Sequence, residues 1–148
     1  MILNEKKGNL FELDKEKYTF AHCISLDDNF KEGIVKQFKK EFKGLQSFCK
    51  KIIEDEHLKV PITITYTNNS YDAVFNLITK NKYSNKPTYE AITSCIEQMA
   101  DICKSCNVKY LAIPKLGCGL DGLQWGKVRE IIMEKFKDID ITIEVRYL

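Results

Sequence analysis

The chain has 148 residues, of which 44% are hydrophobic and 30% are charged, a composition that excludes a disordered segment and is typical of a globular domain. The 23 basic and 21 acidic residues leave a net charge of only +2, which argues against strong non-specific binding of nucleic acid. A chain of this length can bury about 68–70% of its unfolded surface. We therefore expect one domain over residues 1–148.

Targeting signals are not evident in the sequence. The N-terminal residues lack the apolar stretch of a secretory signal, and the apolar runs fall short of the roughly 20 residues that cross a bilayer. We expect a cytoplasmic, monomeric protein without membrane contact. Six cysteines are scattered along the chain, and in the cytoplasm they are expected to be reduced thiols.

Strand-like and helix-like runs alternate along the chain. Short apolar runs predict strands at 18–25, 62–66, 73–79, 110–113 and 141–147, and one further strand is expected before Gly8. Helical spacing predicts helices at 34–43 and 45–55, a long helix opened by Pro87, and a last helix marked by Val128, Ile132 and Phe136. This alternation predicts an α/β domain with helices on both faces of a sheet.

Polar residues stand where three of the expected strands end, the edge at which open α/β sheets bind ligands. The first strand ends at Ser25, the second at Thr79 and Lys80, and the third runs into the loop PKLGCGLDG. A lysine is more often a solvated surface residue, and a reactive one needs partial burial or a cationic neighbour.

The loop PKLGCGLDG is the most informative segment. Gly117 and Gly119 flank Cys118, so the backbone can approach a ligand and turn its N–H groups toward an anion, and Asp121 follows at once. A glycine-rich turn without a ligand explains the pattern about equally well. A Walker A loop is excluded because no GK[ST] follows, and a dinucleotide fingerprint belongs in the first βα unit, not after a late strand.

Two cysteine-based sites are disfavoured. Cys103 and Cys106 form a C-x-x-C without a second ligand pair for zinc, and the spacing fits the end of a helix. Cys118 as a nucleophile would need a base, and His22 lies inside an apolar strand as an expected core residue. We expect no metal and no cofactor.

Four segments, GNLFEL, AHCIS, FNLITKNKYSNKPTYE and IPKLGCGLDGLQW, resemble the macrodomain family from about Gly8 to Leu148. The terminal ADP-ribose protein glycohydrolases are the closest subgroup, and the antitoxin macrodomains that reverse DNA ADP-ribosylation also look similar. The resemblance implies a three-layer α/β/α macrodomain with a mixed central sheet and ADP-ribose in a cleft at the strand ends.

The resemblance also implies roles for individual residues. Lys80 matches the family's catalytic lysine and Asp121 its catalytic aspartate. The ligand-binding residues that it implies are Asn9 and Leu10 near the adenine, Ser25 and Thr79 at strand ends, Lys115, Leu116, Gly117, Cys118, Gly119 and Leu120 around the diphosphate and distal ribose, and Leu148.

Two departures from the family pattern affect the ligand contacts. Asn9 stands where the family usually has aspartate, which implies weaker or altered adenine contacts. The loop DDNFKEG keeps only Gly33, while Lys31 and Glu32 leave less room for close approach of the backbone to phosphate.

The resemblance favours an ADP-ribosyl hydrolase acting on mono-ADP-ribosylated protein, through esters on acidic side chains, or on modified nucleobases of DNA. The mechanism that this resemblance implies has the lysine amine attack the anomeric carbon of the distal ribose, with Asp121 as general acid or base. The alternatives are a non-catalytic ADP-ribose-binding module, an O-acetyl-ADP-ribose deacetylase, and a nucleic-acid-binding protein that uses Lys36, Lys39, Lys40 and Lys43. Those four lysines are more simply a solvated helix face.

Overall fold

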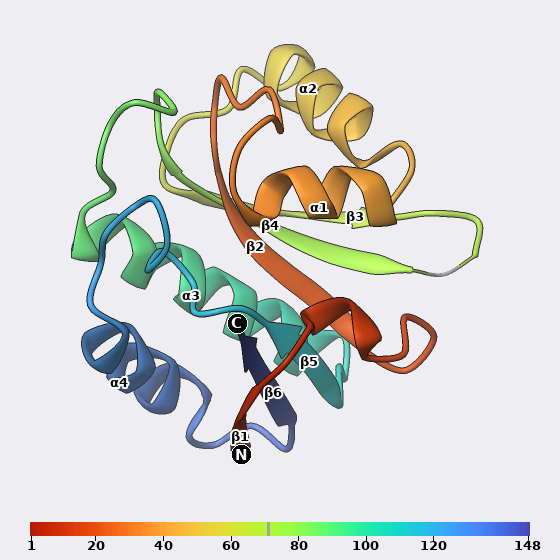
Figure 1. Cartoon of the computed structure of the whole chain (residues 1–148), viewed down its shortest axis with the longest axis vertical. Helices are drawn as coiled ribbons and strands as arrows, with labels where there is room; N and C mark the ends of the chain where they lie inside the picture. Colours follow the sequence, from red (N-terminus) through yellow and green to blue (C-terminus); the bar gives the residue numbers. More distant parts are fainter. Residues whose placement is uncertain (71) are drawn as a thin grey trace.

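Two buried strands, β2 and β4, lie side by side in a sheet whose strand order is β1-β6-β5-β2-β4-β3. The computed structural model describes residues 1–70 and 72–148 (Figure 1). Neighbouring strands are parallel except β3 and β4, which are antiparallel, so the predicted mixed sheet is confirmed. The strands are β1 (Ile2–Lys7), β2 (Thr19–Ser25), β3 (Ile62–Thr67), β4 (Ala73–Lys80), β5 (Tyr110–Ile113) and β6 (Thr142–Tyr147).

Helices cover both faces of the sheet, which confirms the predicted three layers (Figure 1). In β2, Phe20 and Ile24 pack toward α1 and α2, whereas Ala21 packs toward α3 and α4. Strands that are buried on both faces read as continuous apolar runs, which is why β2 and β4 stand out in the sequence. The helices are the short 3₁₀ helix η1 (Leu10–Glu12), α1 (Ile34–Glu41), α2 (Leu45–Asp55), α3 (Tyr89–Ser105) and α4 (Trp125–Phe136).

The long helix α3 begins two residues later than predicted. The Thr88 side chain accepts a hydrogen bond from the Ala91 N–H, which makes Thr88 the N-cap and leaves Pro87 just outside the helix. At the other end Cys103 is buried in the core, but Cys106 is exposed. Of the C-x-x-C pair, only Cys103 is therefore the core residue that the sequence predicts.

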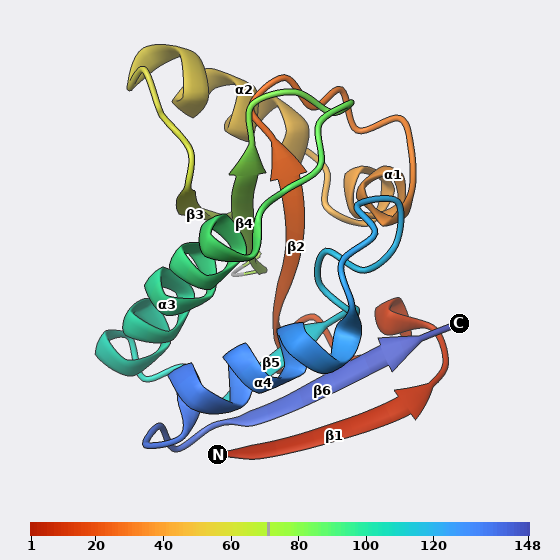
Figure 2. The same cartoon turned by 90° about the vertical axis from the view of Figure 1, so that its left-hand side faces the viewer.

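Strand β1 lies at the sheet edge beside β6, which confirms the expected strand before Gly8 (Figure 2). The two strands are parallel, and Ile2 pairs with Thr142 while Lys7 pairs with Tyr147. The Gly8 N–H then donates to the Tyr147 carbonyl at 2.8 Å. This pairing places the segment after β1 next to the C-terminal residues. No helix in the described ranges is long and apolar enough to cross a membrane.

His22 is a fully buried residue of β2, as predicted. Its ring stacks on Phe38 of α1 with centroids 4.0 Å apart, and its Nε2 lies 2.6 Å from the Asn76 Oδ1. Burial lowers the pKa of His22 to about 4, although the Asn76 hydrogen bond opposes this shift. His22 is therefore a neutral core group near neutral pH.

Candidate functional site

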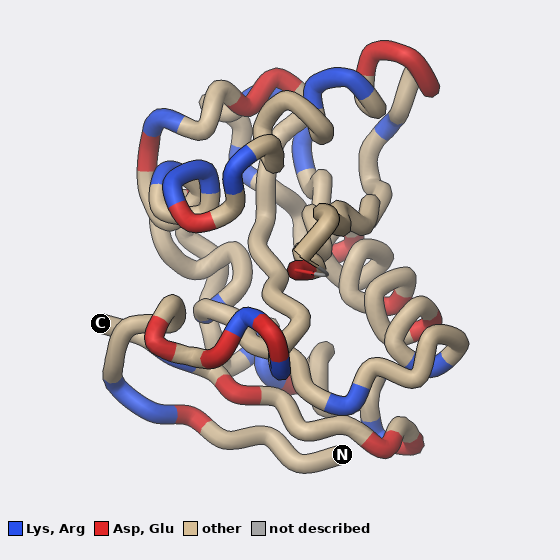
Figure 3. The backbone as a smooth tube through the Cα atoms, turned by 90° about the vertical axis from the view of Figure 1, so that its right-hand side faces the viewer, with Lys and Arg blue, Asp and Glu red and all other residues tan. Residues whose placement is uncertain are grey.

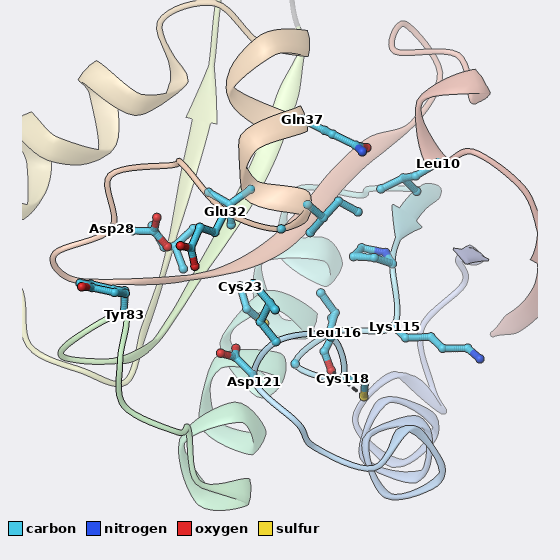
Figure 4. A pocket seen from close by; sticks show the side chains of 18 of the residues that line it. Leu10, Cys23, Asp28, Glu32, Gln37, Tyr83, Lys115, Leu116, Cys118 and Asp121 are labelled. Carbon is cyan, nitrogen blue, oxygen red and sulfur yellow. Dashed lines mark hydrogen bonds between the residues drawn. The ribbon is translucent and has the colours of Figure 1, made fainter. Parts of the chain in front are cut away.

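A cavity of about 770 Å³ opens where β2, β4, β5 and β6 end. Parallel strands present their carboxyl ends at one edge of a sheet, and ligands of open α/β folds bind there. Figure 4 shows Asp28, Tyr83 and Asp121 toward one end of this cavity and Leu10 and Lys115 toward the other. The walls come from the segment after β1, the loops after β2, β4 and β5, the start of α1, and the C-terminal residues.

Lys80 and Asp121 form an ion pair in the cavity wall. The Lys80 Nζ lies 2.5 Å from the Asp121 Oδ1, and it also donates to the Tyr83 carbonyl at 3.0 Å. The side chains are only 11% and 16% exposed. Lys80 is the last residue of β4, and Asp121 lies in the loop after β5, so the fold joins residues that are 41 positions apart. The fold therefore brings a partly buried lysine and a carboxylate together in the cavity wall.

The glycine-rich loop after β5 lines the cavity from Pro114 to Asp121. Gly117 has φ of +72°, and a Cβ there would lie 2.9 Å from the Ile92 Cδ1, so this position requires glycine. The N–H groups of Gly119 and Leu120 donate to no acceptor in the part of the chain that the structure describes. Free N–H groups in a glycine-rich turn suit the oxygens of a phosphate.

The loop between β2 and α1 forms the opposite wall and carries acidic residues. Figure 4 shows Asp28 and Glu32 on the cavity side of this loop. The Asp28 carboxylate accepts from the N–H groups of Ser25 and Phe30 at 3.3 and 2.8 Å. Burial raises the pKa of Asp28, and these hydrogen bonds together with Lys80 oppose the shift. Asp28 thus holds the loop conformation from within.

The far end of the cavity combines apolar and aromatic groups. Leu10 is buried, Leu148 is exposed, and the Lys115 Nζ lies 3.9 Å from the centroid of the Tyr147 ring. The Asn9 Oδ1 accepts from the Phe11 N–H at 3.0 Å and caps η1. The Asn9 oxygen is therefore engaged with the backbone, and the Nδ2 amino group of the side chain is left to donate to a ligand.

Most of the residues predicted for the site line this cavity, but Ser25 and Thr79 do not. Ser25 is fully buried where the β2–β4 register shifts, and its Oγ donates to the Asp27 Oδ1 at 2.9 Å. Thr79 is 3% exposed, and its Oγ1 has no partner in the described ranges. The predicted residues that do line the cavity are Asn9, Leu10, Lys80, Lys115, Leu116, Gly117, Cys118, Gly119, Leu120, Asp121 and Leu148.

Several lining residues were not singled out in the sequence. The loop after β4 contributes Tyr83, Ser84, Asn85 and Lys86, and the Lys86 Nζ donates to the Leu120 carbonyl at 2.8 Å. The signal for this loop was its place directly after a strand that ends in a candidate lysine. Its anchoring to the glycine-rich loop could not be read from the residues.

The thiols of the cavity are not set up for nucleophilic attack. Burial raises the pKa of Cys118 to about 11 and places that of Cys23 well above its ordinary value. Within residues 1–70 and 72–148, no group of three His, Cys, Asp or Glu side chains is arranged to hold a metal ion.

Comparison with known proteins gives the family. Residues 25–132 match the Macro domain family. Over 139 residues the chain is 37% identical to the ADP-ribose glycohydrolase OARD1 of Homo sapiens, covering 94% of this chain and 87% of that protein. The chain belongs to the macrodomain family. The resemblance found in its sequence is thereby confirmed.

Solved structures of other proteins share the fold of this macrodomain. It matches the macrodomain of Thermus aquaticus DarG with a TM-score of 0.87 over 99% of each chain, at 21% identity. It also matches Thermosipho africanus DarTG in complex with ADP-ribose, with a TM-score of 0.85 at 19% identity, over 98% of this chain and 41% of that chain. At these identities the structural likeness shows the fold.

Proposed function

We propose that this macrodomain binds ADP-ribose in its cavity and hydrolyses the bond that joins ADP-ribose to a modified macromolecule. The observation that carries the proposal is the Lys80–Asp121 ion pair in the cavity wall. The relative at 37% identity is named for ADP-ribose glycohydrolase activity, which supports the reaction type. A structure of the same fold contains ADP-ribose, which supports the ligand.

The cavity suits a ligand with an apolar end, a doubly charged middle and a polar end. Its volume of about 770 Å³ is ordinary for a small-molecule site. We place the adenine between Asn9 and Leu10, and the diphosphate on the free N–H groups of Gly119 and Leu120. The distal ribose then reaches Lys80 and Asp121 at the other end.

The proposed reaction begins with a proton transfer inside the ion pair. The Lys80 ammonium gives one proton to Asp121, its hydrogen-bonded neighbour, and the amine nitrogen then has a free electron pair. That nitrogen attacks the anomeric carbon of the distal ribose, so a C–N bond forms and the C–O bond to the modified side chain breaks. For a glutamate ester, the leaving group departs as a carboxylic acid after taking the proton from Asp121.

Water completes the cycle. The bond from the anomeric carbon to the ring oxygen breaks, the ring oxygen takes one proton from the lysine nitrogen, and a protonated Schiff base forms. Water then adds to this carbon while Asp121 accepts a proton from it. The nitrogen takes the proton back from Asp121 and a second proton from the new hydroxyl group as the C–N bond breaks, so Lys80 returns to an ammonium and free ADP-ribose leaves. Lys80 and Asp121 thus return to their starting protonation states, and the net reaction consumes one water molecule.

The test measures release of ADP-ribose from a glutamate-modified protein and from ADP-ribosylated DNA. We expect wild type to release ADP-ribose from at least one substrate, and Lys80→Ala and Asp121→Ala to lose at least 100-fold in rate, on the order of the effect of one acid–base group. Lys51→Ala and Asp101→Ala, which change exposed residues outside the cavity, serve as matched controls.

Titration with free ADP-ribose separates binding from turnover. Binding without release from either substrate would replace the hydrolase by a binding module for those linkages. Release that survives in both cavity variants would exclude the Lys80–Asp121 mechanism.

A further inference from the structure

Asp27 links two loops that border the cavity. Its Oδ1 accepts from the Ser25 Oγ at 2.9 Å and from the Tyr83 N–H at 2.7 Å. Asp27 belongs to the loop after β2, whereas Tyr83 belongs to the loop after β4, 56 residues later. One carboxylate oxygen therefore ties the end of a buried strand to an exposed loop.

Tyr83 passes this restraint on to Lys80 through its backbone. The carbonyl of Tyr83 accepts from the Lys80 Nζ at 3.0 Å, and the same Nζ contacts the Asp121 carboxylate. A hydrogen-bonded chain thus runs from Ser25 through Asp27 and Tyr83 to Lys80 (Figure 4 shows the labelled Tyr83 and Asp121 around this corner of the cavity).

The loop that holds the Tyr83 carbonyl has little packing to fix it. Residues 81–86 are all exposed, and the Tyr83 side chain is 61% exposed. The position of this loop therefore depends on a few hydrogen bonds. The bond from the Tyr83 N–H to Asp27 holds the residue whose carbonyl contacts Lys80. The lysine stem is long and flexible, and an ammonium adopts a fixed direction only when acceptors hold it.

We propose that Asp27 is a positioning residue for Lys80, acting through the backbone of Tyr83. The proposal rests on the proposed function for its kinetic consequence, but the placement of the ammonium can be measured without turnover. An error of about 1 Å in the position of a reacting group can reduce a rate by about 100-fold. A change that loosens the Tyr83 carbonyl should therefore affect the reaction more than it affects ligand binding.

The test compares Asp27→Ala and Asp27→Asn with Asp14→Ala. Asp14 is a matched control because it is exposed, its Oδ1 accepts from a backbone N–H at 2.9 Å, and it lies outside the cavity. We expect Asp27→Ala to lower kcat about tenfold while the Kd for ADP-ribose changes less than about twofold, as loss of two hydrogen bonds to a positioning group predicts. Asp27→Asn keeps an acceptor oxygen and should restore part of the rate.

A second readout follows the Lys80 ammonium directly. Its ¹⁵N NMR signal, assigned by its loss in Lys80→Arg, should move or broaden in Asp27→Ala and stay in place in Asp14→Ala. This readout separates the two proposals. If wild type shows no turnover, the proposed function is wrong, but the ammonium signal still tests the role of Asp27.

Two results would overturn the positioning role. One is a Lys80 signal that does not change in Asp27→Ala. The other is a drop in kcat that is accompanied by a similar fold-loss of ADP-ribose affinity and by a lower melting temperature, which indicates a structural role alone. If Asp27→Ala does not fold, the same comparisons are made with Asp27→Asn, for which an unchanged signal and kcat overturn the role.

Discussion

Leu120 packs against Gly33, where an added Cβ would lie 3.2 Å from the Leu120 Cδ1. Leu120 belongs to the glycine-rich loop after β5, and Gly33 lies just before α1, so the two walls of the cavity approach each other at this pair. Gly33 has φ of +68° and ψ of −157°, a conformation that is essentially restricted to glycine. The close approach of the two loops therefore depends on this one glycine of the loop.

Gly33→Ala should weaken both the fold and ligand binding. Backbone strain of about 1–3 kcal/mol is expected at this position, and the new methyl group would displace Leu120. The comparison is with Gly126→Ala in α4, where no atom lies within 4 Å of an added Cβ and where alanine should be neutral or stabilising. Thermal unfolding and ADP-ribose titration measure the two effects. Equal behaviour of the two variants would contradict this reading.

Glu32→Gln should tighten the binding of ADP-ribose. The Glu32 carboxylate lies in the wall that faces the glycine-rich loop, where the proposed diphosphate carries negative charge. Removing one exposed like charge should lower the Kd about two- to fivefold at low ionic strength, and added salt should reduce the gain. Titration calorimetry at two salt concentrations gives the answer, with Glu130→Gln on α4 as the control. A gain that does not respond to salt would exclude an electrostatic cause.

Burial of His22 should make the fold less stable as the pH falls. Its pKa is lowered from 6.5 to about 4 by burial, so between these values the unfolded chain binds a proton that the folded chain does not. The stability that His22 contributes to the fold is therefore fully present above pH 6.5 and is lost as the pH falls toward 4. By linkage, the buried neutral His22 lowers the free energy of unfolding by about 2 kcal/mol at pH 5.

The measurement is urea unfolding at pH 7.5 and pH 5 for wild type and His22→Gln. The decrease in unfolding free energy between the two pH values should be smaller in the variant, because its amide does not titrate. The difference between the two decreases isolates His22 from the carboxylates, which are common to both proteins. Equal decreases would show that His22 does not carry this pH dependence.

Cys118 should react slowly with alkylating reagents, and ADP-ribose should protect it further. Burial raises its pKa to about 11, with Asp121 adding to the shift and Lys115 opposing it, so little thiolate exists at pH 7.5. Its labelling rate should rise about 100-fold between pH 7.5 and pH 9.5, since the thiolate fraction rises tenfold per pH unit below the pKa. Site-resolved mass spectrometry follows the reaction.

Cys106 provides the internal reference for this experiment, because it is exposed and lies outside the cavity. ADP-ribose should slow the labelling of Cys118 without changing that of Cys106. Protection of both thiols, or of neither, would place the ligand elsewhere.

The sequence predicted the buried strands better than the exposed one. Strand β4 reads as a continuous apolar run because both of its faces are buried, and its predicted range differs from the observed one only by Lys80. Strand β1 lies at the sheet edge with five of its six residues exposed, so it has no apolar alternation to reveal it. Its position comes from backbone pairing with β6, which composition does not encode.

Part of the cavity lining could be predicted from the sequence, but the geometry of the cavity could not. Lys80 and Asp121 follow different strands, and they meet because β4 and β5 flank β2 in the sheet, an order that periodicity does not give. The family resemblance supplied the pair instead. Ser25 ends β2 but does not line the cavity, and its fully buried side chain lies where the β2–β4 register shifts after Ile24. The catalytic and binding roles stay predictions.

The parallel pairing of β1 with β6 sends the two chain ends in opposite directions across the molecule. Leu148 is 88% exposed and lines the cavity, whereas Met1 lies just before the start of β1, at the opposite end of the strand pair (Figure 3 marks both ends). A purification tag or fluorescent partner fused after Leu148 would therefore begin at the mouth of the cavity and compete with ligands for space. One fused before Met1 would begin at the opposite end of the sheet, which makes the amino terminus the side for immobilising this protein in a binding assay.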